Sequence, residues 1–337
     1  MKKSHKVFIT IGSIVLALAL VLTVLNLIPP KKNVESNPFL VGEGRLPMIA
    51  AHRGGGANNP ENTMLAFREA VYGYDVDILE SDLYMTRDGH LVYNHDAYID
   101  ETCNVNGDIL LEEVRELCKD ESRRHYIKDM TLEELQRYNF GYYFKDKNGE
   151  RIYQHVENVA EAGLQIATVD ALFEEFYKDY PELLFILEIK DSGERGVEAC
   201  RILSKALEKY SAYVSRVVVG TFHDEIEVEL RNNYPHLLRG APTGSAAKFI
   251  LTQYFGVNLL DNGSDFACLQ IPMAYDVGFE LSLTAKTLVR RAHRRNIAVQ
   301  YWTINDAEDM RTLIEMGVDC IMTDDPALLA EVLKEYQ

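Results

Sequence analysis

The sequence is short of positive charge relative to negative charge. It holds 35 lysine and arginine residues against 52 acidic residues, which gives a formal net charge of −17. A domain this acidic repels a polyphosphate backbone, so the composition argues against nucleic acid as a partner. A small phosphate ester would bind only where local cations or a metal ion offset the negative field.

Paired cysteine motifs are also missing. None of the five cysteines lies in a CxxC pair, which argues against a zinc knuckle or a thioredoxin-like redox site. Cys103 and Cys118 are close enough in sequence to form a disulfide if the domain is exported. We favour the alternative interpretation, in which all five cysteines are small buried apolar residues.

Charge is absent altogether from residues 7–28, an apolar run of 22 residues. A helix needs about 20 apolar residues to cross a bilayer, so the run predicts one N-terminal transmembrane helix. A signal peptide has a shorter apolar region, about 7–15 residues, and ends in small residues, whereas this run ends in Leu-Ile-Pro-Pro-Lys-Lys. An uncleaved anchor is therefore favoured over a cleaved signal. A buried core helix is disfavoured because the run has no polar face.

The flanks of this helix predict its topology. Residues 1–6 carry three lysines and no acid, and such a tail is hard to translocate, so it is expected to stay in the cytoplasm. Residues 29–46, which contain Pro, Gly and Asn, are predicted to be a linker. Residues 47–337 are then a folded domain on the extracytoplasmic side of the cell membrane.

Short β-branched runs recur in this domain between amphipathic segments. Several are apolar on both faces, which is typical of strands in a buried parallel sheet. Their alternation with helical patterns predicts an α/β fold, either a TIM (β/α)8-type barrel or a doubly wound sheet. The predicted strands are Met48–Ala51, Asp77–Met85, Leu91–Asn94, Leu184–Ile189, Val217–Thr221, Leu237–Gly240, Phe266–Ile271, Ala298–Ile304 and Cys320–Thr323.

Nine strands are one more than such a barrel needs. The second and third are joined by the tight turn Arg87–His90, whereas adjacent parallel strands need a crossover of about a dozen residues. One of the two is therefore predicted to be irregular or antiparallel. Residues 97–165 lack a strong strand pattern, are rich in tyrosine and contain the capping box Thr131–Glu134, so they are predicted to be an insertion.

Helix boundaries are indicated between the strands. Asn62-Thr63 is expected to begin a helix that ends at Gly73. Asp170 is expected to cap another helix, and Asn305 to begin one that ends at Gly317.

Polar residues gather where several strand-like runs end. His52 and Arg53 leave an apolar run into glycines, which places an acid–base group and a fixed cation beside backbone that can approach a ligand closely. His95 follows another run, and histidine titrates near neutral pH. Glu188 and Lys190 share one face of a third run.

Three carboxylates lie at comparable positions. Alternation puts Glu80 and Asp82 on one face of a strand, and Glu188 occupies a later strand end. Barrel enzymes collect catalytic groups from the carboxyl ends of different strands. These hard oxygen ligands suit Mg²⁺ or Ca²⁺ rather than zinc. A single carboxylate at such a position is more often a solvated or salt-bridged residue. The prediction of a functional site therefore depends on all of these residues occurring together.

The combination resembles the glycerophosphodiester phosphodiesterase family over about residues 47–336. The resemblance implies a TIM barrel with a small insertion after the third strand, in agreement with the insertion at 97–165. The matching motifs are His52-Arg53-Gly54, Pro60-Glu61-Asn62-Thr63, Glu80-x-Asp82, Thr86-x-Asp88-Gly89, His95-Asp96, Glu188-Ile189-Lys190, Gly220-Thr221-Phe222, Tyr301-Trp302-Thr303-Ile304-Asn305 and Gly317 to Pro326.

The resemblance also implies roles for individual residues. By it, His52 and His95 are the catalytic acid–base pair, and Glu80, Asp82 and Glu188 hold the divalent metal ion. Arg53 and Lys190 look like the cations that bind the phosphate, and Trp302 looks like a wall of the substrate pocket.

In similar enzymes one histidine takes a proton from a glycerol hydroxyl that attacks phosphorus, and the other protonates the departing alcohol. Water then opens the cyclic phosphate. The products are glycerol 3-phosphate and an alcohol. The sequence departs from the family pattern at Tyr74, at Thr221 and in the Tyr-rich insertion, none of which is a proposed catalytic or metal residue.

Two alternatives stay open at this point. The same chemistry could act on a lysophospholipid or a glycerophosphate polymer, which the membrane anchor and the Tyr-rich insertion favour. The other alternative is a barrel that has no catalytic activity and only binds at the membrane. Such a protein would be expected to have lost a catalytic histidine or a metal-binding carboxylate. The sequence keeps both histidines, His52 and His95, and all three carboxylates, Glu80, Asp82 and Glu188.

Overall fold

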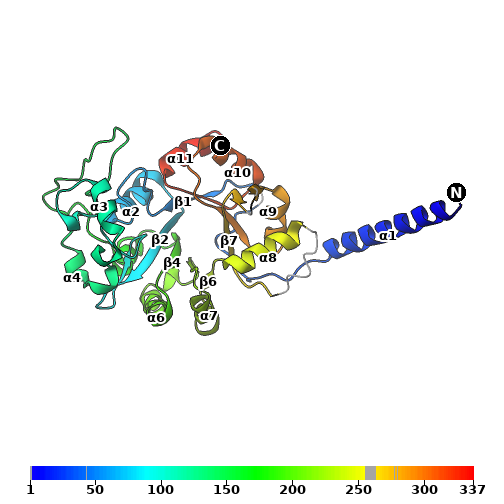
Figure 1. The fold of residues 1–337 in the computed structure, drawn as a ribbon, viewed down its shortest axis with the longest axis horizontal. Helices are drawn as coiled ribbons and strands as arrows, with labels where there is room; N and C mark the ends of the chain where they lie inside the picture. Colours follow the sequence, from blue (N-terminus) through cyan, green and yellow to red (C-terminus); the bar gives the residue numbers. More distant parts are fainter. Residues whose placement is uncertain (1, 43, 255–262, 277, 279) are drawn as a thin grey trace.

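The domain is a parallel β-barrel enclosed by helices (Figure 1). The computed structural model describes residues 2–42, 44–254, 263–276, 278 and 280–337. Its parallel strands follow the order β6-β5-β4-β2-β1-β11-β10-β7, and hydrogen bonds from Ala267 N to Arg239 O and from Ala241 N to Cys268 O bring the two ends of the sheet together. The TIM-barrel prediction is confirmed. The barrel strands are β1 (Met48–His52), β2 (Ile78–Met85), β4 (Leu184–Ile189), β5 (Val217–Gly220), β6 (Leu238–Arg239), β7 (Cys268–Ile271), β10 (Ala298–Tyr301) and β11 (Cys320–Thr323).

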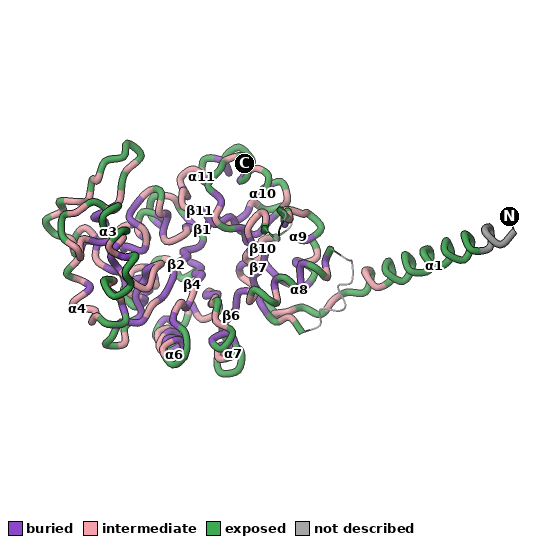
Figure 2. The backbone as a smooth tube through the Cα atoms, viewed as in Figure 1, coloured by how far each residue is buried: buried purple, intermediate pink, exposed green. Residues whose placement is uncertain are grey.

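Helices cover the outside of the barrel and bury one apolar face each against it (Figure 2). Phe173 of α5 (Val169–Phe176) and Phe185 of β4, for example, pack edge to face with ring centroids 5.0 Å apart between helix and sheet. The barrel helices are α2 (Met64–Arg68), α5 (Val169–Phe176), α6 (Gly193–Lys209), α7 (Asp224–Asn233), α8 (Thr243–Tyr254), α9 (Lys286–His293), α10 (Ala307–Met316) and α11 (Pro326–Lys334).

The predicted strand that does not belong to the barrel is β3 (Leu91–Tyr93), the third in chain order. It pairs antiparallel with the end of β2, with Leu83 opposite Tyr93, because the Thr86–His90 turn is too short for a crossover. This confirms that one of the two strands is antiparallel. A short hairpin of β8 (Ala274–Asp276) and β9 (Glu280–Ser282) was not predicted, since its strands have only three residues each.

Two predicted helix starts are wrong by one or two residues. Thr168, not Asp170, caps α5 by accepting a hydrogen bond from Ala171 N, so Asp170 lies in the first turn. Asp306, not Asn305, caps α10. Asn305 instead binds the chain at the end of β11, where its side-chain oxygen accepts a hydrogen bond from Asp324 N. The cap at Thr63 and the left-handed C-cap at Gly317 are as expected.

The insertion follows β3 and has a small core of its own. It contains α3 (Leu111–Cys118), α4 (Leu132–Leu135) and short 3₁₀ turns, and the capping box at Thr131 is formed. Tyr142 and Tyr143 pack edge to face under the guanidinium of Arg151. The buried side chains of its core are Val92, Ile99, Cys103, Ile127, Leu135, Phe140 and Ile166.

The segment between the N-terminal helix and the barrel is packed against the barrel. Phe39 is fully buried among the apolar side chains inside the amino-terminal end of the barrel, such as Ala50 and Cys320. Asn37 donates hydrogen bonds to Ala267 O and Asn296 O. The segment therefore connects the two parts and also closes one end of the barrel.

The N-terminal helix α1 (Lys2–Leu27) extends away from the barrel (Figure 1). Its stretch Val7–Leu27 has a mean hydropathy of 2.7, and none of its residues is buried within the protein. By length and composition, this one apolar helix could cross a membrane.

All five cysteines are buried free thiols, which confirms the favoured interpretation of the cysteines.

Candidate active site

The predicted site residues lie at the carboxyl-terminal ends of the barrel strands. His52 ends β1, Glu80 and Asp82 lie in β2, and Glu188 lies in β4. The strand register places His52 beside Glu80 and Asp82 beside Glu188. Parallel pairing therefore gathers, at one end of the barrel, groups that are far apart in the sequence.

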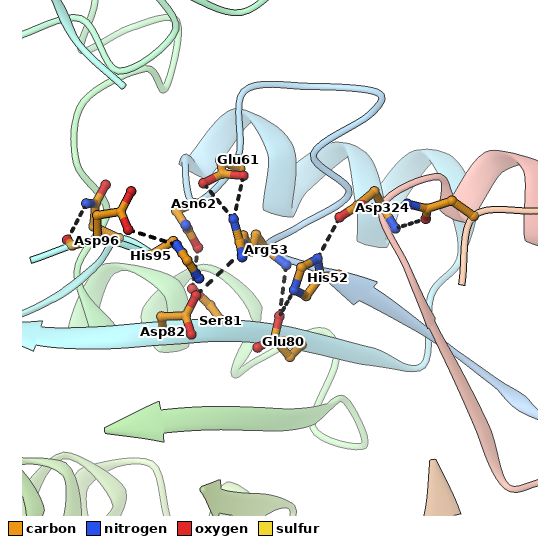
Figure 3. A network of polar contacts seen from close by, with 12 residues as sticks. His52, Arg53, Glu61, Asn62, Glu80, Ser81, Asp82, His95, Asp96 and Asp324 are labelled. Atoms are coloured by element: carbon orange, nitrogen blue, oxygen red, sulfur yellow. Dashed lines mark hydrogen bonds and ion pairs between the residues drawn. The ribbon is translucent and has the colours of Figure 1, made fainter. Parts of the chain in front are cut away.

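His52 is held between two carboxylates (Figure 3). Its Nδ1 lies 2.6 Å from Asp324 Oδ1, and its Nε2 lies 3.9 Å from Glu80 Oε2. Burial opposes a positive charge on the imidazole, but the hydrogen bond with Asp324 and the charges of Glu80 and Asp324 outweigh it and raise the pKa of His52. The contact with Asp324 fixes which ring nitrogen faces the site.

Arg53 is fixed by its backbone and its side chain. Its φ of 54° lies in the left-handed region, which a residue with a side chain adopts only when its surroundings impose it. Arg53 N donates to Glu80 Oε2 at 3.0 Å. The guanidinium lies between Glu61, at 3.1 Å, and Asp82, whose Oδ2 is 3.7 Å from Nε (Figure 3). This arrangement aims a fixed cation at the mouth of the barrel.

His95 approaches the same region from the loop after β3. Its Nδ1 lies 3.1 Å from Asp96 Oδ1, a hydrogen bond that lowers the pKa of Asp96. Asn94 orders the loop by donating hydrogen bonds to Asp96 O and Tyr98 O. Both histidines thus have a carboxylate at Nδ1, which leaves Nε2 as the nitrogen available for proton transfer.

Lys190 lies between two of the predicted metal ligands. Its Nζ is 3.1 Å from Asp82 Oδ1 and 3.0 Å from Glu188 Oε1. Burial disfavours the ammonium, but the two carboxylates outweigh this and raise the pKa of Lys190. Burial and the neighbouring Asp82 raise the pKa of Glu80. Four charged groups therefore share a small, poorly solvated volume.

The chemistry of the carboxylate donors, though not their present arrangement, suits a hard divalent cation. Glu80 is 6% and Asp82 3% exposed, and within the described part of the chain Asp82 Oδ2 accepts no hydrogen bond although it is buried. A buried carboxylate oxygen without a hydrogen bond is one that a metal cation could coordinate, although the Arg53 guanidinium lies 3.7 Å from it here. In the present arrangement the Lys190 ammonium bridges the carboxylates, and among the described residues no three acidic, His or Cys side chains converge closely enough to ligate a metal ion.

Aromatic side chains border the mouth. Trp302 directly follows β10 and is 38% exposed. Phe222, two residues after β5, is 66% exposed and has the Lys190 ammonium 5.8 Å from its ring centroid. Exposed aromatic rings close to the cationic side chains of the site are suited to contact the organic part of a phosphate ester.

Several residues of the site were not assigned a role from the sequence. Asp324 directly follows β11, and the strand-end criterion that identified His52 would have identified it as well. Glu61 pairs with Arg53 from the loop after β1, and Ser81 Oγ donates to Asn62 Oδ1 at 2.5 Å. These pairings could not be inferred from spacing, since only the folded loop brings them together.

The chain is similar in sequence to known proteins. The family model described as "Glycerophosphoryl diester phosphodiesterase family" matches residues 52–328. A glycerophosphodiester phosphodiesterase of Caldanaerobacter subterraneus subsp. tengcongensis is 28% identical over 292 residues, covering 86% of this chain and 98% of the relative. The lysophospholipase D GDPD3 of Mus musculus is 21% identical over 321 residues, which cover 89% of this chain and 87% of that relative.

The fold is similar to solved structures. A phosphodiesterase of Oleispira antarctica, whose structure is in complex with the product sn-glycerol-3-phosphate, superposes with a TM-score of 0.60 at 19% identity, covering 86% of this chain and 97% of that one.

Proposed function

This chain belongs to the glycerophosphoryl diester phosphodiesterase family of hydrolases, and we propose that it cleaves glycerophosphodiesters to glycerol 3-phosphate and an alcohol. The observation that carries the proposal is the pairing of His52 with Asp324 and of His95 with Asp96 around the cations Arg53 and Lys190. The product in the Oleispira antarctica structure is the one expected from this reaction.

The two histidines act as acid and base in this proposal. The Nε2 atom of one imidazole takes the proton from a glycerol hydroxyl, whose oxygen then bonds to phosphorus. The bond from phosphorus to the other alcohol breaks, and the second imidazole donates a proton to the departing oxygen. Water then opens the cyclic phosphate. Arg53, held by Glu61, faces the negative charge on the phosphoryl oxygens in a poorly solvated site.

We further propose that Glu80, Asp82 and Glu188 hold Mg²⁺ or Ca²⁺. Such an ion would supply Lewis-acid stabilisation of charge on the phosphoryl oxygens. Lys190, which now lies between Asp82 and Glu188, would then turn its ammonium toward the phosphate. Trp302 would contact the glycerol or alcohol portion.

A lysophospholipid or glycerophosphate-polymer headgroup is the second candidate substrate. It is supported by the apolar helix α1 and by the similarity to the mouse lysophospholipase D. The exposed rings of Trp302 and Phe222 at the mouth would tolerate an acyl chain.

We propose that α1 anchors the protein in the cell membrane as a single span, with residues 1–6 in the cytoplasm and the barrel outside. The support is the length of the apolar stretch and the lysines that precede it.

Purified full-length protein, assayed against glycerophosphocholine and against lysophosphatidylcholine with and without added metal ion, tests the reaction and the substrate together. We expect metal-dependent release of glycerol 3-phosphate from glycerophosphocholine. Exclusive release of choline from lysophosphatidylcholine would favour the second candidate, and turnover of neither would contradict the proposed reaction.

A further inference from the structure

Helix α9 presents a row of cations along its exposed side. Lys286, Arg290 and Arg294 follow one another at intervals of four residues, so they lie on one face of the helix, and all three are exposed. Leu288 and Val289 on the opposite side are buried against the barrel. The helix is thus attached by its apolar side and directs its basic side outward.

This row reaches the end of α1. The guanidinium of Arg294 donates hydrogen bonds to Asn26 O at 2.8 Å and to Ile28 O at 3.1 Å, at the last turn of the apolar helix. Lys31 and Lys32 follow directly and are exposed. The basic side of α9 therefore begins where the apolar stretch ends, which is the depth of lipid headgroups if α1 crosses a bilayer.

Exposed apolar side chains lie next to the row, on the last turn of α8. Leu251 is 52% and Tyr254 48% exposed, while Phe249 on the other side of α8 is buried. The two helices are linked at this point, since Arg291 donates a hydrogen bond to Gln253 O. Leu251, Tyr254, Lys286, Arg290 and Arg294 are called the α8–α9 face below.

The local charge is opposite to that of the whole protein. Residues 281–305 contain five lysine and arginine residues and no acid, in a chain whose net charge is −17. Burial, together with the like charges of Arg290 and Arg294, lowers the pKa of Arg291. This cationic region therefore favours an anionic partner.

The direction of α1 places the α8–α9 face toward a membrane. In Figure 1 the barrel strands surround a common centre, whereas α1 runs across the picture and leaves the barrel beside α8 and α9. If α1 stands upright in a bilayer, the barrel lies on its side with these two helices nearest the lipid. Helices α6 and α7, and α3 in the insertion, lie farther from α1 (Figure 1).

We propose that the α8–α9 face docks on anionic phospholipid headgroups next to α1, so that the barrel is held on its side at the membrane surface. The proposal rests on the proposed membrane insertion of α1. Cations on the face attract the anionic headgroups, and the exposed ring and apolar chain of Tyr254 and Leu251 suit the interface. The mouth of the barrel would then open along the membrane, within reach of substrates at headgroup level.

The test uses full-length protein reconstituted into vesicles that contain nitroxide-labelled lipid. Because the five native cysteines are buried, a cysteine introduced by Leu251→Cys can be labelled selectively with a fluorophore. Val228→Cys on α7 is the matched control, since Val228 is 47% exposed and α7 lies away from α1. Vesicles of 30% phosphatidylglycerol in phosphatidylcholine are compared with pure phosphatidylcholine.

We expect lipid quenching of the label at residue 251 in the anionic vesicles, little quenching in pure phosphatidylcholine, and none at residue 228. High salt should reduce the quenching. Adding Lys286→Gln and Arg290→Gln should lower the ratio of docked to undocked protein by about fivefold for each charge removed. Lys205→Gln, an exposed change on α6, should leave it unaltered.

Equal quenching at residues 251 and 228, or no effect of the two glutamine substitutions, would overturn the docking surface. A carbonate wash separates this failure from failure of the anchor. Protein that resists the wash but shows no quenching at residue 251 contradicts docking alone. Protein that is washed off contradicts the membrane span, and the docking proposal with it, while the hydrolytic activity is judged independently by its own assay.

Discussion

The Nδ1 atom of His52 lies 2.6 Å from Oδ1 of Asp324, although the two residues are 272 positions apart in the chain. The contact follows from the sheet, because β1 and β11 pair in parallel with Ala51 opposite Thr323, and the next residue of each strand points into the same mouth. Asp324 is therefore a positioning residue for His52. Asn305, which donates to Asp324 Oδ2 at 2.7 Å, holds it in turn.

Asp324→Asn should lower kcat by about tenfold or more while changing KM little, because the neutral amide no longer stabilises the imidazolium or fixes the tautomer of His52. Steady-state kinetics on glycerophosphocholine measure both constants. Asp306→Asn is the control, since Asn is an equally good cap for α10 and its kcat should stay unchanged. A change in KM alone would argue against the positioning role.

His52→Ala and His95→Ala should each lower turnover by about 10²–10⁴-fold, the usual contribution of a general acid or base. Circular dichroism should show an intact fold, because neither side chain belongs to the apolar core. His236→Ala, at an exposed position outside the site, should keep full activity. Near-normal turnover of either active-site variant would contradict the two-histidine mechanism.

Chelation should abolish activity, and Mg²⁺ or Ca²⁺ should restore it, because Glu80, Asp82 and Glu188 offer only hard oxygen ligands. Glu188→Gln should weaken metal affinity, measured by calorimetry, more than it lowers the melting temperature. Glu198→Gln, an exposed carboxylate on α6, should bind metal normally. Full activity in excess chelator, with no metal in the purified protein, would refute the metal proposal.

Gly196→Ala and Gly244→Ala should change stability in opposite directions. A Cβ at residue 196 would lie 2.3 Å from Asp191 O and 2.5 Å from Ile226 Cδ1, so the substitution should cost about 1–3 kcal/mol. Gly244, in the first turn of α8, has open space, and alanine there should stabilise by up to about 1 kcal/mol. Denaturant unfolding measures both, and a stabilised Gly196→Ala would contradict the close packing of α6.

The barrel should be accessible from outside the cell. A soluble protease added to intact spheroplasts is expected to digest the domain, and detergent should be needed to extract the full-length chain, because α1 is an uncleaved span in our proposal. N-terminal sequencing separates this from a cleaved signal, whose mature protein would begin near residue 29 or beyond. Digestion only after lysis would place the barrel in the cytoplasm.

The sequence by itself predicted alternating parallel strands and helices, because buried parallel strands leave a local signal. The family resemblance then selected the barrel over a doubly wound sheet. All nine predicted strands are present, and two of them, Leu184–Ile189 and Cys320–Thr323, have the predicted bounds. The shortness of the turn Arg87–His90 also excluded a parallel pair, and the structure shows the antiparallel one of the two alternatives left open. The hairpin of β8 and β9 was missed, since strands of only three residues, none of them buried, have no pattern that distinguishes them from a loop.

The sequence also indicated which residue types gather at the site, since residues at the carboxyl ends of parallel strands must meet. Only the tertiary structure decided how they pair. That Asp324 faces His52, that Glu61 holds Arg53 and that Lys190 bridges Asp82 and Glu188 depend on strand register and loop conformation. The same holds for Phe39, whose burial inside the barrel end is fixed by contacts with strands that lie far along the chain. Local periodicity determines which elements form, whereas these contacts arise from long-range packing that no short stretch of sequence encodes.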